Sequence, residues 1–145
     1  MPDILYIHPA KHGVDTGFQD LGFFFFLPVG VIGLINALRQ VGRSVRGVNY
    51  PAELLRDRSF RLKPWLAAQK DVHLVLVDLH WYMHSYGAVR VAQACKEVLP
   101  HARVVIGGIT YSFTSPSTCL GKMIRPFARR WTWRSALGGS IRRTC

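Results

Sequence analysis

The stretch VHLVLVD at residues 72–78 decides the fold of this chain. A continuous apolar and β-branched run of this length is typical of a parallel strand that helices cover on both faces. Three other runs with strand character occur at residues 4–8, 44–50 and 103–106. Helical patterns lie between the four runs, at residues 28–42, 52–70 and 86–99. This alternation predicts an α/β fold with a parallel sheet and right-handed crossovers.

The first helical pattern lies within an unusually apolar region, because residues 21–38 carry no charge. A membrane span is the alternative for this region, since arginines follow at positions 39, 43 and 46. Pro28, three glycines and Asn36 interrupt the region, and its length is marginal for a bilayer. We therefore favour a helix that begins near Pro28 and ends at Gly42 as its left-handed cap. Its predicted apolar face consists of Val31, Leu34, Ile35 and Leu38.

The other two helical patterns are less regular. Residues 52–70 predict one helix, or two short helices broken near Pro64, with Trp65 and Leu66 facing the sheet. Residues 86–99 predict a helix that Pro100 ends. The apolar stripe of this last helix consists of Val89, Ala92, Cys95 and Leu99.

Ligands of open parallel sheets bind beyond the carboxyl ends of the strands, so the loops after the strands are the candidate sites. The loop at residues 79–85 has the sequence LHWYMHS and directly follows Asp78. The pair Gly107-Gly108 ends the fourth strand and permits close approach of a bulky ligand, although a tight turn explains it equally well.

Other chemistries fit the same loops less well. Asp78, His80 and His84 could bind a metal, but an irregular loop gives them no fixed face, and hydrogen bonding or packing is favoured. Acid–base work by a histidine beside Asp78 is a further alternative. His8, Lys11 and His12 could contact an anion, or could lie in the loop without a function. The common phosphate-loop, dinucleotide and nucleophile-elbow motifs are absent from the sequence.

The charge of the chain is concentrated at its carboxyl end. The formal net charge is +11, and residues 116–145 contribute seven basic residues and no acidic one. Three widely spaced cysteines form neither a disulfide framework nor a metal knuckle. The first residues lack the pattern of a secretory signal. Reduced thiols and a cytoplasmic location are therefore expected.

Four segments together resemble the N-terminal cobalamin-binding domain of radical SAM proteins. They are Ile-Leu-Tyr-Ile-His-Pro at 4–9, Leu-Pro-Val-Gly-Val-Ile-Gly-Leu at 27–34, Val-Leu-Val-Asp-Leu-His-Trp-Tyr at 75–82 and Ala-Arg-Val-Val-Ile-Gly-Gly-Ile-Thr at 102–110. In such domains a Ser-x-Leu motif after one strand and a Gly-Gly pair after the next line the pocket for the nucleotide tail of the cofactor. Here Asp78-Leu79-His80 takes the place of Ser-x-Leu, and 26 residues separate it from Gly107-Gly108.

The resemblance implies a flavodoxin-like domain at residues 1–113 that lacks its last strand and binds cobalamin. The Asp-x-His-x-x-Gly motif that supplies a cobalt-ligating histidine is missing after the first strand. Base-off, His-off cobalamin is therefore what the resemblance implies. The Cys-x-x-x-Cys-x-x-Cys motif of radical SAM domains is also missing. No catalytic residue, protein-ligated metal or iron–sulfur cluster is thus expected, and a separate radical SAM domain would be the partner.

We expect the cofactor to lie over the carboxyl ends of the strands. The residues expected to line its pocket are Lys11, His12, Asp78, His80, Trp81, Gly107, Gly108 and Thr110.

The tail at residues 114–145 follows no strand or helix pattern. One hypothesis is that it is the out-of-frame or truncated end of a longer gene, which would make the chain a non-functional fragment. The alternative is a basic arm in which Trp131 and Trp133 interleave with arginines to bind nucleic acid or an anionic membrane. Both of these partners are disfavoured, because no recognised nucleic-acid motif accompanies the arm.

Overall fold

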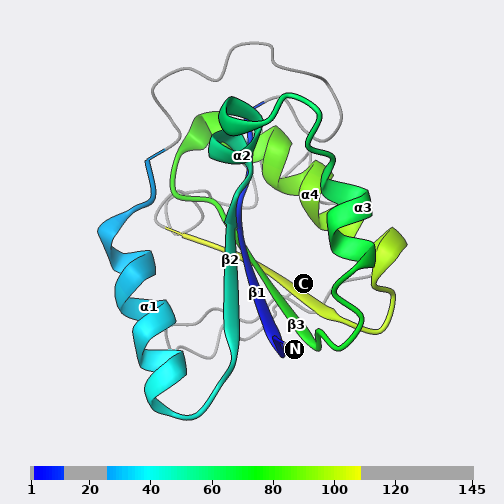
Figure 1. Ribbon diagram of the computed structural model, residues 1–145. Helices are drawn as coiled ribbons and strands as arrows, with labels where there is room; N and C mark the ends of the chain where they lie inside the picture. The colour runs from blue at the N-terminus through cyan, green and yellow to red at the C-terminus, as the bar shows by residue number, and fades with distance from the viewer. Residues whose placement is uncertain (1, 12–25, 109–145) are drawn as a thin grey trace, which may run out of the picture. The chain divides into compact units, whose positions relative to one another are not determined.

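The computed structural model describes residues 2–11 and 26–108, and these form an α/β fold around one four-stranded parallel sheet (Figure 1). The strands are β1 (Ile4–His8), β2 (Val45–Asn49), β3 (Leu74–Asp78) and β4 (Arg103–Gly107). They lie in the order β2-β1-β3-β4, and each neighbouring pair is parallel. Flavodoxin-like sheets have this order over their first four strands, so the predicted fold class is confirmed. The predicted boundary at residue 113 and the tail lie outside the described residues.

The helices occupy both faces of the sheet, with α1 on one side and α3 and α4 on the other (Figure 1). The helical elements of the described residues are α1 (Val29–Gln40), α2 (Tyr50–Arg56), α3 (Leu62–Ala67), the 3₁₀ turn η1 (Tyr82–His84) and α4 (Ser85–Val98). Helix α4 packs against β3, β4 and α3. None of the helices in this part of the chain is both long enough and apolar enough to cross a membrane.

The core lies between the sheet and the layer of α3 and α4. Leu5 pairs with Val75 and Ile7 with Val77, so these four buried side chains share one face of the sheet. The guanidinium of Arg46 lies on the same face, 5.4 Å from the centre of the Trp65 ring. Each buried aliphatic side chain contributes about 1.5–3 kcal/mol, which makes this layer the main source of stability.

On the opposite face of the sheet, helix α1 packs over β2. A Cβ added to Gly47 of β2 would lie 3.9 Å from Ile35 Cδ1. Val31, Ile35 and Leu38 are half-buried as predicted, but Leu34 is 47% exposed, so its predicted place on the packed face is wrong. The predicted left-handed cap is confirmed by the φ of +79° at Gly42.

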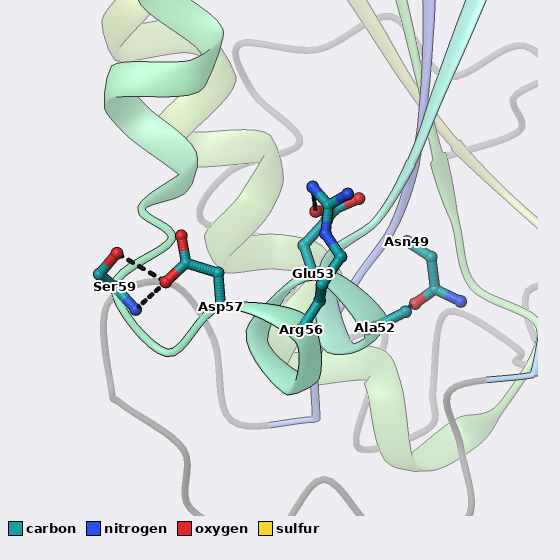
Figure 2. A network of polar contacts seen from close by, with 6 residues as sticks. All are labelled: Asn49, Ala52, Glu53, Arg56, Asp57 and Ser59. Atoms are coloured by element: carbon teal, nitrogen blue, oxygen red, sulfur yellow. Dashed lines mark hydrogen bonds and ion pairs between the residues drawn. The ribbon is translucent and has the colours of Figure 1, made fainter.

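The region at 50–67 forms two short helices, and side-chain hydrogen bonds fix their limits (Figure 2). Asn49 Oδ1 accepts a hydrogen bond from the Ala52 N–H and caps α2. Asp57 Oδ1 accepts from the backbone N–H and the hydroxyl of Ser59, at 2.8 and 2.6 Å, which turns the chain after α2. The predicted break near Pro64 is therefore wrong, because the break lies before α3 and Pro64 fits within the first turn of that helix.

Helix α4 begins one residue earlier than predicted, at Ser85. Ala92, Cys95 and Leu99 are buried as expected, but Val89 is only half-buried. Ala88 and Val91 complete the buried face in its place. The buried face of α4 packs against both β3 and β4, so it is wider than the predicted apolar stripe.

Candidate functional site

The candidate site lies at the carboxyl ends of β1 and β3. After β1 the chain forms α1 and β2 on one side, and after β2 it returns to place β3 on the other side of β1. The strand order therefore reverses between β1 and β3. Open α/β sheets bind their ligands in the crevice at such a switch point.

The last residues of the two strands form a buried polar pair at this point. His8 ends β1 and Asp78 ends β3, and Nδ1 of His8 lies 2.8 Å from Oδ2 of Asp78. The two side chains are 0% and 4% exposed. An ionised carboxylate only accepts hydrogen bonds, so we assign the proton of the pair to Nδ1. Asp78 thus fixes the orientation and the tautomer of the His8 ring.

Two further side chains complete what we call the switch-point cluster: Tyr6, His8, Asp78 and His84. The His84 ring meets the His8 ring edge-on, with 4.9 Å between their centres. Burial, and to a smaller extent the nearby His8, lowers the pKa of His84 to about 4, while Asp78 opposes the shift. Burial, followed by the charge of Asp78, raises the pKa of the Tyr6 hydroxyl. Tyr6 and His84 are therefore neutral near pH 7.

The loop after β3 is joined directly to the glycine pair after β4. Asp78 pairs with Gly107 in the sheet, and the Leu79 N–H donates to the Gly107 carbonyl oxygen at 2.7 Å. Gly108 has a φ of +144°, and a Cβ at this position would lie 2.5 Å from the Leu79 carbonyl oxygen. Gly107 differs from Gly108, because its Cβ would meet no atom of the described residues within 4 Å. Gly108 thus permits backbone packing, whereas the described residues leave room for a side chain at Gly107.

A second close backbone contact fixes the start of α4. A Cβ added to Gly87 would overlap the carbonyl oxygen of Ala10, two residues after the end of β1. The segment after β1 therefore packs directly on the first turn of α4, next to His84.

The structure brings some of the predicted pocket residues together. Asp78, Gly107 and Gly108 are neighbours, although the Asp78 carboxylate is turned toward His8. His80 and Trp81 lie on the loop after β3, with their rings edge-on at 4.8 Å, and Trp81 is 39% exposed. Lys11 is half-buried on the segment after β1. His12 and Thr110 lie outside the described residues.

Comparisons with family models, curated proteins and solved structures found no match for this chain. The geometry of the site is therefore the basis of any functional inference. Within residues 2–11 and 26–108, no group of three histidine, cysteine or acidic side chains is arranged to hold a metal ion. The metal-binding alternative for Asp78, His80 and His84 accordingly has no support from the described residues.

Sequence reasoning missed the switch-point cluster as a unit. It considered His8 as an anion contact and His84 as a metal ligand, and it did not single out Tyr6. The sequence contains a pattern that could have indicated the cluster. Tyr6 and His8 alternate with apolar residues in a strand whose five residues are all buried. Polar side chains in a buried strand need polar partners, and the end of a neighbouring parallel strand is the place to look for them.

Proposed function

We propose that this chain carries a cobalamin-binding module, with the cofactor over the carboxyl ends of β1, β3 and β4. The observation that carries the proposal is the contact between the Asp78-Leu79-His80 segment and Gly107-Gly108. Asp78 pairs with Gly107, and the Leu79 N–H donates to the Gly107 carbonyl oxygen. The resemblance rested on order and spacing in the sequence. A single ligand can contact both segments only if they are also adjacent in space.

The open space beside Gly107 supports the same proposal. A bulky ligand needs a stretch of backbone that no side chain shields, and among residues 2–11 and 26–108 a Cβ at Gly107 would meet no atom within 4 Å. Trp81 adds a partly exposed aromatic surface on the adjoining loop, suited to contact with a large and partly apolar cofactor.

The burial of His8 and His84 supports cobalamin bound without either of these two histidines as a ligand. His8 is fully buried and its ring is held by Asp78, and His84 is 1% exposed. Neither imidazole is presented to a ligand above the strand ends. Bound cobalamin would supply cobalt-centred group transfer, and we propose a separate radical SAM domain as the partner that uses it.

Equilibrium dialysis of the full chain against hydroxocobalamin tests the proposal. We expect one equivalent to bind to the parent chain, and binding about tenfold weaker or worse for Gly107→Leu, because the new side chain fills the space that the ligand would use. Gly33→Leu is the matched control, since Gly33 is an exposed glycine of α1 with no atom within 4 Å of its Cβ position. Circular dichroism checks that both variants fold. Absence of binding to the parent chain, or equal binding by the parent and Gly107→Leu, would refute the proposal.

A further inference from the structure

The turn between α2 and α3 carries an exposed serine that is held in a defined geometry. Ser59 lies in the stretch 57–61 between the two helices, and its side chain is exposed. Its hydroxyl donates to Asp57 Oδ1 at 2.6 Å, and its backbone N–H donates to the same oxygen at 2.8 Å (Figure 2). Asp57 and Arg61, at the two ends of the stretch, have extended backbone conformations. The hydroxyl is therefore accessible to an enzyme that binds its substrate as an extended chain.

Arginines lie on both sides of this serine. Arg56 precedes it by three residues, and Arg61 follows it by two. The Arg61 guanidinium is held against the turn, because its Nη1 donates to the carbonyl oxygen of Arg58 at 2.9 Å. The hydrogen bonds from Ser59 lower the pKa of the Asp57 carboxyl, and the charges of Arg56 and Arg61 contribute to the same shift. Both guanidinium groups therefore act near the position that a phosphate on Ser59 would occupy.

The two other serines of the described residues differ from Ser59. Ser85 is buried, and its hydroxyl donates to the Tyr82 carbonyl oxygen. Ser44 is exposed, but its carbonyl oxygen accepts the N–H of Asp3 at the start of the sheet, and no arginine lies three residues before it. Among the serines of the part of the chain that the structure describes, only Ser59 combines exposure with an arginine at this spacing.

We propose that Ser59 is the phosphorylation site of a protein kinase that selects an arginine three residues before the acceptor serine. The phosphoryl donor is ATP. The Ser59 Oγ forms a bond to the γ-phosphorus, the bond from that phosphorus to the β–γ bridging oxygen breaks, and ADP leaves. The hydroxyl proton passes to the catalytic aspartate of the kinase. Arg56 is suited to recognition by an acidic kinase surface, because it is 79% exposed and its pair with Glu53 is a weak surface ion pair.

The phosphate changes the hydrogen bonds of the turn. The Ser59 Oγ no longer carries a hydrogen, so its bond to Asp57 is lost, and the added charge of about −1.5 to −2 repels the Asp57 carboxylate. The Arg61 guanidinium offers charge-assisted hydrogen bonds to the phosphate instead. Phosphorylation thus exchanges a contact with Asp57 for one with Arg61 and alters the connection between α2 and α3. This inference concerns the turn and is independent of the ligand at the strand ends.

Treatment of the full chain with the catalytic subunit of cyclic-AMP-dependent protein kinase and Mg-ATP tests the site. We expect tandem mass spectrometry to find phosphate on peptides that contain Ser59, and none on Ser44. Arg56→Gln should slow the labelling of Ser59 about tenfold or more. Lys63→Gln is the matched control, because the pair of Lys63 with Glu97 is also a surface ion pair, and it should be labelled within about twofold of the parent rate.

Titration of the phosphate, followed by phosphorus-31 NMR, tests the contact with Arg61. The second pKa of phosphoserine is about 6, and a guanidinium stabilises the dianion. We expect this pKa to lie about half a pH unit higher in Arg61→Gln than in the parent chain. Arg90→Gln, which alters an exposed arginine of α4, should leave the value unchanged. Circular dichroism checks that the variants fold. If Arg61→Gln does not fold, a rise of the phosphate pKa of the parent chain in concentrated salt replaces the comparison.

Absence of phosphate from Ser59 in the parent chain would overturn the proposal. The same holds if Arg56→Gln is labelled as fast as Lys63→Gln, or if the phosphate pKa does not respond to the loss of Arg61 or to its screening by salt.

Discussion

Replacement of Gly108 by alanine should strongly destabilise the fold, because the backbone of the glycine pair is pressed against the loop after β3. Gly108 has a φ of +144°, and its Cβ would lie 2.5 Å from the oxygen and 2.6 Å from the carbon of the Leu79 carbonyl. Backbone strain of this kind costs about 1–3 kcal/mol. Displacing Leu79 would also weaken its hydrogen bond to Gly107, which is worth about 1 kcal/mol. We therefore expect Gly108→Ala to lower the free energy of unfolding by about 2–4 kcal/mol.

The neighbouring glycine provides a matched control. A Cβ at Gly107 meets no atom of the part of the chain that the structure describes within 4 Å, so Gly107→Ala should change the free energy of unfolding by no more than about 0.5 kcal/mol. Urea denaturation followed by far-ultraviolet circular dichroism measures both variants. A loss below about 1 kcal/mol for Gly108→Ala, or equal losses at the two positions, would refute the reasoning.

Three further predictions concern buried groups. Asp78→Ala leaves the His8 ring buried without its carboxylate, and urea denaturation should show a loss of about 2–4 kcal/mol, with a smaller loss for Asp78→Asn; equal losses would contradict this. The pKa of His84 is 6.5 in the unfolded chain and about 4 in the folded chain. The contribution of neutral His84 to the free energy of unfolding is therefore complete above pH 6.5 and falls by up to about 3 kcal/mol toward pH 4. Thermal unfolding of the parent and of His84→Gln across this range should show the difference shrinking, and a constant difference would exclude the effect. Burial raises the pKa of the Cys95 thiol to about 12, so iodoacetamide at pH 8 should alkylate Cys95 in urea but not in the native chain, as read from its tryptic peptide; rapid native labelling would contradict this.

The sequence predicts the strands well because parallel strands are buried on both faces and therefore read as continuous apolar runs. β3 and β1 agree with their predicted ranges to within two residues. The limits of α1 follow from Pro28 and from Gly42, whose backbone takes the expected left-handed conformation. These features depend on local conformation, so no partner distant in the sequence is needed to predict them.

The errors occur where a particular side chain overrides the general pattern. Pro64 was expected to break a helix, yet proline is tolerated in a first turn, and the hydrogen bonds of Asp57 with Ser59 produce the break earlier. Leu34 fits the apolar periodicity of α1 but is 47% exposed, although Ile35 beside it reaches Gly47 of β2.

The switch-point cluster depends on tertiary structure. His8 and Asp78 are 70 residues apart, and they meet only because β3 lies beside β1. Hydrophobic periodicity predicts strands but does not give their order. Similarly, the sequence did not decide whether Gly108 permits the approach of a ligand or forms a tight turn. The contact of Gly108 with Leu79 favours the tight turn.

The visible spectrum of hydroxocobalamin during titration with the full chain tests the central claim most directly. The account predicts a saturable change at one equivalent, with the spectrum of cobalamin whose own base has left the cobalt and has not been replaced by a histidine. A spectrum that stays that of free cobalamin at excess protein would contradict the account.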